Sequence, residues 1–137
     1  MVEKRIIVHS LAEAEAALGA AAALEVAVTL VSARGMAGFM GPMWFKVLIE
    51  EAAAAQPAAR VTAMLDCADE PGTVLAALRA GLKRVRFGGG EETRRRLDEI
   101  ASQLDARVEA ETPDGAELDL LDQRDPAGAC RAFLRAD

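Results

Sequence analysis

The chain has 137 residues, of which 52% are hydrophobic, and it carries a net charge of −6. Thirty of the hydrophobic residues are alanine, which leaves about 41 larger apolar side chains, enough for one core and too few for two domains. Two cysteines, one histidine and a charged fraction of 28% exclude a disulfide-built fold, a Cys/His zinc module and a disordered chain.

Apolar run lengths and charge distribution predict the compartment of the protein and exclude two classes of partner. Only three apolar residues separate Arg5 from His9, too few for the core of a signal peptide. The longest apolar run, Ala16–Leu24, is about half a membrane span. Residues 97–137 carry 4 basic and 11 acidic side chains, and nucleic-acid affinity comes mainly from basic surface. We therefore expect a cytoplasmic protein with reduced thiols and with neither nucleic acid nor membrane as a partner.

Apolar, strand-like runs alternate with helical stretches, a pattern typical of βα units in a parallel sheet. The expected strands are Arg5–Val8, Val26–Val31, Arg60–Leu65 and Leu82–Phe87. The expected helices are one capped by Ser10 and ending near Leu24, then Met43–Ala55, Pro71–Gly81 and Glu91–Ala106. These elements predict one α/β domain over residues 1–137, with three layers and a mainly parallel sheet of four or five strands. A flavodoxin-like, doubly wound arrangement is the preferred version of this fold.

Local signals support several of these boundaries. Ser10 followed by Glu13 forms a capping box at a helix start, and Gly81 is a typical residue for a helix end. Arg84 and Arg86 alternate with apolar residues, which places their strand near an edge of the sheet or gives it one polar face.

The last third of the chain is predicted as a terminal hairpin and a short helix. Arg107–Glu111 and Glu117–Leu121 read as strands, and the turn signal Thr112–Gly115 lies between them. A final helix begins at Asp125-Pro126.

Candidate ligand-binding residues follow the expected strands, because parallel sheets bind ligands beyond the carboxyl ends of their strands. These residues are His9-Ser10, Ser32-Ala33-Arg34, Asp66-Cys67 and Gly88-Gly89-Gly90. His9 is a candidate general base with Asp66 as its orienter, or else a structural histidine. Asp66 with Asp69 offers carboxylates for Mg²⁺, but helix capping explains both, so we expect no metal and no cofactor.

Gly88-Gly89-Gly90 is the most suggestive feature for ligand binding. Residues without side chains allow an anion to approach backbone N–H groups at a helix start, and Arg34 could add a positive charge. The alternative is a tight turn that requires positive φ. Glu91 and Glu92 already supply negative charge at that helix start, and neither a P-loop nor a GxGxxG motif is present. A second basic cluster is expected to be solvated surface. Its members are Lys83, Arg84, Arg86, Arg94, Arg95 and Arg96.

The stretch Leu65–Thr93 resembles a βα unit of phosphate-binding (β/α)-barrel enzymes. The residues that carry the resemblance are Ala76–Val85 and Gly88–Gly90. It implies a helix that ends in a small-residue turn and glycines that bind phosphate after the next strand. The resemblance covers about a fifth of the chain, and 137 residues are about half of a barrel, so one copy cannot form a full barrel.

Cys67 stands between a strand end and a helix start, a setting that can activate a thiol. This placement is similar to that of the cysteine in small sulfur-relay α/β proteins of the DsrE type. The neighbouring Asp66, Asp69 and Glu70 would raise the pKa of this thiol, so an inert cysteine is the alternative. Cys130 is expected to be a packing residue.

The segment Gly35–Phe45 concentrates large apolar side chains. It contains Met36, Phe39, Met40, Met43, Trp44 and Phe45. Packing onto its own domain is one interpretation, and an oligomer interface is another, because methionine and aromatic residues are enriched at interfaces. A pocket for an apolar ligand is a third interpretation. The interface candidates are Met36, Phe39, Met40 and Trp44.

Taken together, these features favour a small homo-oligomeric binding or regulatory module. The alternative is an enzyme or carrier for a phosphorylated or other anionic metabolite, with His9, Arg34, Asp66 and Gly88–Gly90 lining its site. A sulfur-relay protein that uses Cys67 is the third hypothesis.

Overall fold

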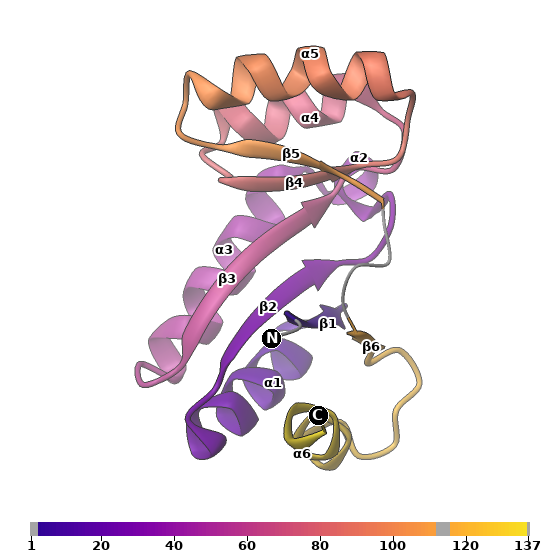
Figure 1. Cartoon of the computed structure of the whole chain (residues 1–137). Helices are drawn as coiled ribbons and strands as arrows, with labels where there is room; N and C mark the ends of the chain where they lie inside the picture. Colours follow the sequence, from indigo (N-terminus) through magenta and orange to yellow (C-terminus); the bar gives the residue numbers. More distant parts are fainter. Residues whose placement is uncertain (1–2, 112–115, 137) are drawn as a thin grey trace. The chain divides into compact units, whose positions relative to one another are not determined.

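The computed structural model describes residues 3–111 and 116–136. It confirms an α/β domain in which helices alternate with the strands of a parallel sheet (Figure 1). The strands are β1 (Lys4–Val8), β2 (Ala27–Ser32), β3 (Arg60–Asp66), β4 (Arg84–Phe87), β5 (Arg107–Ala110) and β6 (Ala116–Asp119). The helices are α1 (Leu11–Leu24), α2 (Met36–Met40), α3 (Pro42–Ala55), α4 (Pro71–Arg79), α5 (Glu91–Ser102) and α6 (Pro126–Arg135).

The sheet differs from the expectation in its strand number and strand order. Within the described residues it has six strands in the order β5-β4-β3-β2-β1-β6, where four or five were predicted. Each strand from β1 to β5 therefore neighbours the next strand along the chain. A flavodoxin-like sheet has the order 2-1-3-4-5, so the preferred doubly wound arrangement is wrong in this respect. Hydrophobic patterning identifies strands but does not say which strands become neighbours.

The predicted terminal hairpin is also wrong. Its two strands exist, but β5 pairs in parallel with β4, and β6 pairs in parallel with β1. The predicted turn Thr112–Gly115 lies outside the described residues. The strand pattern was correct and the pairing was not, because β5 pairs with the preceding strand β4, whereas β6 pairs with β1, more than 100 residues away.

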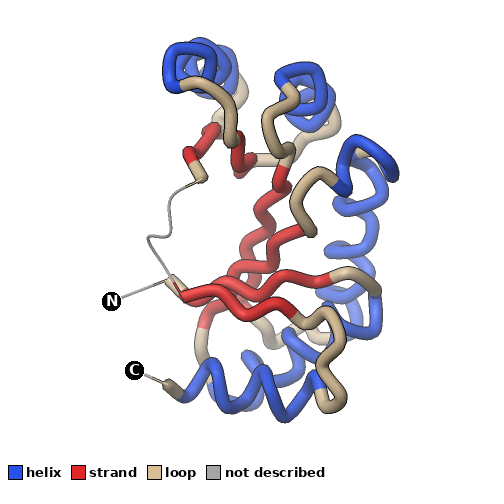
Figure 2. The backbone as a smooth tube through the Cα atoms, turned by 90° about the vertical axis from the view of Figure 1, so that its right-hand side faces the viewer, coloured by secondary structure: helices blue, strands red, loops and turns tan. Residues whose placement is uncertain are grey.

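Two compact units make up the domain, and each draws on separate stretches of the chain. The first unit contains Met1–Val31, Val47–Thr62 and Pro113–Asp137. Its helices α1 and α6 lie side by side (Figures 1 and 2). Lys4 holds the end of α6, because its Nζ donates to the carbonyls of Phe133 (3.1 Å) and Ala136 (2.7 Å). Cations at helix C-termini also interact favourably with the helix dipole.

The second unit contains Ser32–Lys46 and Ala63–Thr112. In it, α4 and α5 lie on one side of β4 and β5 (Figures 1 and 2). Val85 and Phe87 of β4 and Val108 of β5 are buried. Burial of such side chains is the main stabilising term for a layer of helices on a sheet.

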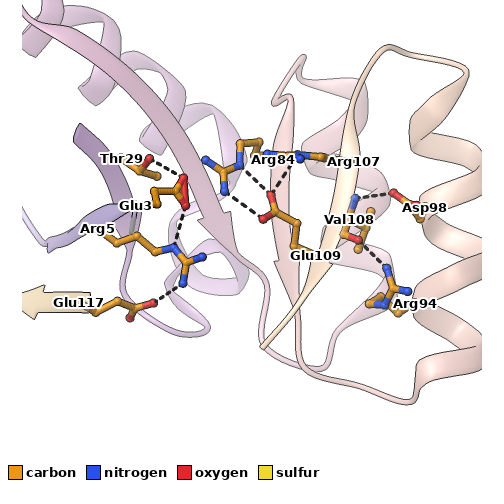
Figure 3. Close-up of polar contacts among 10 residues, drawn as sticks. All are labelled: Glu3, Arg5, Thr29, Arg84, Arg94, Asp98, Arg107, Val108, Glu109 and Glu117. Atoms are coloured by element: carbon orange, nitrogen blue, oxygen red, sulfur yellow. Dashed lines mark hydrogen bonds and ion pairs between the residues drawn. The ribbon is translucent and has the colours of Figure 1, made fainter. Parts of the chain in front are cut away.

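Charged pairs occupy alternate positions of the strands, as Arg84 and Arg86 predicted for β4. In the second unit, Arg84 forms two hydrogen bonds to Glu109, at 2.7 and 2.9 Å (Figure 3). In the first unit, Arg5 contacts the carboxylates of Glu3 (3.1 Å) and Glu117 (3.4 Å). Both arginines are 8% exposed. Such burial requires paired charges, because an unpaired buried charge is strongly destabilising.

Two sequence signals at helix ends are confirmed in their main part. The Ser10 hydroxyl accepts the N–H of Glu13, and Glu13 reaches back to the N–H of His9 at 2.8 Å instead of to that of Ser10. Gly81 follows α4 with a φ of +94°, a conformation that glycine adopts without strain. The segment before Met43, for which no helix was expected, contains the short helix α2, and Gly41 is its C-cap.

Candidate functional site

Asp66 is a buried carboxylate at the carboxyl end of β3. Its Oδ1 accepts the N–H of Ala68 at 2.8 Å, and its Oδ2 accepts Nε of Arg86 at 3.0 Å. Its own backbone N–H donates to the hydroxyl of Ser32 at 2.9 Å. Burial raises the pKa of Asp66, and the hydrogen bond from Ala68 and the charge of Arg86 oppose that rise. These contacts fix the carboxylate in one orientation at the strand end.

Arg34 and Glu111 form an ion pair beside this strand end. The guanidinium Nε of Arg34 lies 3.0 Å from Oε1 of Glu111, and the Arg34 side chain is 59% exposed. Glu111 directly follows β5, and Arg34 follows β2. The negative charges of Asp66 and Asp69 also act on Arg34. The pair thus places an accessible cation next to several carboxylates.

The carboxylate of Glu111 lies against Gly88, so a side chain at this position would displace it. A Cβ at Gly88 would stand 2.5 Å from the Glu111 carboxylate, and real Cβ atoms do not approach that closely. The Gly88 N–H donates to the carbonyl of Ala68 at 2.6 Å. Residues that follow β3, β4 and β5 therefore meet at one point. We call Arg34, Asp66, Gly88 and Glu111 the strand-end cluster.

The other two glycines of the triplet have different roles. A Cβ at Gly89 would clash with the ring of Phe87, whereas a Cβ at Gly90 would meet nothing within 4 Å. Gly90 is the N-cap of α5, and Glu91 and Glu92 occupy its first turn. Among the described residues, the glycines with positive φ are Gly35, Gly41 and Gly81. The triplet is therefore not the positive-φ turn that the sequence offered as an alternative, and Gly88 and Gly89 are instead close to neighbouring side chains.

His9 has a different carboxylate partner from the one expected. Its Nε2 lies 2.7 Å from Oδ1 of Asp119, at the end of β6. Burial opposes the charged form of Asp119, but the N–H of Leu121 and the His9 ring outweigh it and lower the pKa of Asp119. Asp119 is therefore the group that orients His9, and Asp66 is engaged with Arg86.

The environment of Cys67 argues against thiolate chemistry. Cys67 is fully buried, and burial together with the charges of Asp66 and Glu70 raises the pKa of its thiol to about 12. A thiol in that state is protonated at neutral pH and is a poor nucleophile. Cys130 is also buried, and its pKa is raised to about 11, first by burial. Both cysteines are free of disulfide bonds.

The segment Gly35–Phe45 divides into a buried part and an exposed part. Phe45 is fully buried, whereas Phe39 is 91% exposed. Met40 and Met43 are about half exposed, at 51% and 52%, and Met36 and Trp44 are intermediate. Exposed large apolar side chains in one place often mark an interaction site. We call Met36, Phe39, Met40 and Trp44 the apolar surface.

The predicted basic cluster is largely used for internal contacts. Arg84 and Arg86 pair with carboxylates, and Lys83 donates to the carbonyl of Leu104 at 2.8 Å. Arg94 contacts Glu91 and β5, whereas Arg96 pairs with Glu92 on the exposed side of α5. This cluster is therefore not a continuous basic surface.

Sequence reasoning missed three residues of these sites: Arg86, Glu111 and Asp119. Arg86 was noted for its alternation in β4, and Glu111 and Asp119 stand at the ends of strands that were given no ligand-binding role. The available signal was the polar residues at the carboxyl ends of the last two strands, which were not considered together with those of the first four. Over residues 3–111 and 116–136, no three His, Cys, Asp or Glu side chains gather to hold a metal ion. Nor has any helix in that part of the chain the length and apolar character to span a bilayer.

The comparisons with known proteins support the fold. No protein-family model and no curated protein matches the chain. Among solved structures, the chain is similar to a "putative fructose-1,6-biphosphate aldolase" from Coccidioides immitis, with a TM-score of 0.63 and 17% sequence identity. The similarity covers 80% of this chain and 45% of the aldolase chain. At 17% identity this likeness shows a shared α/β fold alone, which is consistent with the resemblance noted for Leu65–Thr93.

Proposed function

We propose that this protein is a homo-oligomeric binding or regulatory module that associates through the apolar surface. The observation that carries this proposal is Phe39, which is 91% exposed on the short helix α2. Met40 is exposed beside it in the sequence, and Met43 is exposed at the start of α3. Burying a side chain of this size contributes about 1.5–3 kcal/mol. A second copy of the chain would supply that burial.

Light scattering across a concentration series tests this proposal. We expect a dimer or larger species that shifts towards the monomer in Phe39→Ser and in Trp44→Ala. Leu121→Ser is the matched control, because Leu121 is also exposed, at 57%, and lies outside the apolar surface. A wild-type chain that is monomeric at high micromolar concentration, with no response to either variant, would contradict the proposal.

The strand-end cluster favours a second candidate function, that of an enzyme or carrier for an anionic metabolite. Arg34 is the accessible cation of the cluster, and the carboxylate it contacts lies against Gly88. A phosphorylated ligand would have to replace Glu111 at Arg34. The aldolase similarity makes a sugar bisphosphate a reasonable first probe, although at 17% identity it shows the fold alone.

Thermal melting with inorganic phosphate and with fructose 1,6-bisphosphate tests this second candidate. A ligand that binds only the folded state raises the melting temperature. We expect a larger rise in Glu111→Gln, which removes the competing charge, and none in Arg34→Ala. Arg96→Ala is the control, because Arg96 is an exposed arginine on α5. Equal behaviour of all variants at millimolar ligand would rule the site out.

The sulfur-relay hypothesis is tested by alkylation of the folded protein. A sulfur carrier needs a reactive thiolate, whereas the pKa of Cys67 is raised to about 12. We expect the rate of Cys67 alkylation to be limited by the rate at which the protein unfolds around it. Rapid alkylation under native conditions would restore this hypothesis.

A further inference from the structure

The strand β5 stands at one end of the sheet order, and side chains of α5 bind the outer backbone groups of its residue Val108. In a parallel ladder, alternate residues direct their N–H and C=O groups to opposite neighbours. Arg107 donates its N–H to the carbonyl of Lys83, which immediately precedes β4. The N–H and C=O of the next residue, Val108, therefore point away from β4, towards the open edge.

Both outer groups of Val108 are bound by charged side chains. Asp98 Oδ1 accepts the Val108 N–H at 2.8 Å, and Arg94 Nη1 donates to the Val108 carbonyl at 2.8 Å (Figure 3). Arg94 and Asp98 are four residues apart on α5, so they lie on the same face of the helix. Together they bind the one donor and the one acceptor that Val108 offers at the edge.

The arginine of this arrangement is itself held in place. Glu91 receives two hydrogen bonds from Arg94, at 3.0 Å from Nε and 2.7 Å from Nη2. The Arg94 side chain is 18% exposed. A paired, largely covered guanidinium is less easily displaced by an incoming strand than an exposed, solvated side chain.

We propose that Arg94 and Asp98 form an edge guard that prevents β5 from pairing with an extended strand of a second copy. An exposed strand edge is a template for such pairing. An incoming strand would need the N–H and C=O of Val108, and the guard occupies both. The inference concerns the β5 edge alone and does not rest on association through the apolar surface.

The test removes the guard in a background whose apolar surface lacks Phe39. Arg94→Ala with Asp98→Ala is introduced into Phe39→Ser, so that any new association does not depend on Phe39. We expect assembly at a concentration at least about tenfold lower than in the parent. Intermolecular β-structure in the infrared amide I band and thioflavin T binding should accompany it.

Two matched variants separate a guard from general destabilisation. Arg96→Ala with Glu92→Ala removes the exposed ion pair on the same helix and should leave assembly unchanged. Asp98→Asn keeps an acceptor oxygen for Val108 and should also stay close to the parent. Assembly in these variants to the same extent as in the double alanine variant would overturn the proposal.

Hydrogen exchange at the Val108 amide provides the second readout. In dilute, unassociated protein, Asp98→Ala should speed exchange of this amide about tenfold or more. In the assembled state the amide should become protected again by the new strand. A folded double variant that remains unassociated wherever the parent does overturns the proposal. If the double variant does not fold, Asp98→Ala alone is tested in the same background, with the same results expected.

Discussion

Phe39 and Phe45 lie six residues apart in one apolar segment, and the structure treats them in opposite ways. Phe45 is fully buried in α3, whereas Phe39 is 91% exposed on α2. Gly41, with a φ of +81°, separates the two helices, and Pro42 begins the second one. The core interpretation and the interface interpretation of this segment thus apply to different residues. Composition identified an unusual segment, and the break between two helices divides it.

The largest expected effect is on the buried side of this comparison. Phe45→Ala should lower the free energy of unfolding by about 3–5 kcal/mol, because it deletes a fully buried ring and leaves a cavity. Urea denaturation followed by circular dichroism measures the change. A loss below about 1 kcal/mol would show that Phe45 is not part of the core.

The same contrast between buried and exposed groups applies to ion pairs. Asp66→Ala should cost about 1.5–3 kcal/mol, because it deletes the buried oxygens that accept hydrogen bonds from the Ala68 N–H and from Arg86. Arg96→Ala breaks an ion pair whose side chains are both 75% exposed and should cost less than about 0.5 kcal/mol. Equal losses in urea denaturation of the two variants would remove the distinction.

The carboxylates of Asp66 and Asp119 should respond to pH with opposite signs. The pKa of Asp119 is lowered in the fold, so its stabilising contribution exists above its unfolded pKa of about 3.9 and is lost as pH falls through the lower, folded value. The pKa of Asp66 is raised, so its contribution exists below the unfolded pKa and is lost as pH rises through the folded value.

Thermal melts between neutral and acid pH test the half-exposed Asp119. The stability difference between the wild type and Asp119→Asn should be less than about 1 kcal/mol and should shrink as the pH becomes acidic. His9→Ala should reduce the same difference, because it removes one of the hydrogen bonds that lower the pKa. A difference that grows on acidification would contradict the assigned direction.

The smallest expected effect on folding belongs to Phe39. Phe39→Ala should change the free energy of unfolding by less than about 0.5 kcal/mol in dilute protein. Urea denaturation below the association concentration is the measurement. A loss close to that of Phe45→Ala would mean that Phe39 packs within its own chain, and it would break the comparison.

Local features of the fold were readable from the sequence. The alternation of strands and helices, the Ser10 cap and the Gly81 helix end depend on residues close together in the chain, and the structure has them. The polar face of β4 followed from Arg84 and Arg86 for the same reason.

Features that depend on distant partners were not readable. The pairing of β6 with β1, and of His9 with Asp119, joins residues more than 100 positions apart. The contact of Gly88 with the carboxylate of Glu111, 23 residues later, has no local signal either. A single sequence shows which strands and side chains are able to pair, but it does not show which of them are in contact in the fold.

The way the chain passes between its two compact units has a practical consequence for fragment studies. The first unit uses three stretches of chain and the second uses two, and the stretches alternate. No single cut separates the two units. Each fragment either lacks a stretch of a unit or also carries a stretch of the other unit. Proteolytic or recombinant halves should therefore fail to fold alone and should regain structure only when mixed, as a complementation assay would detect.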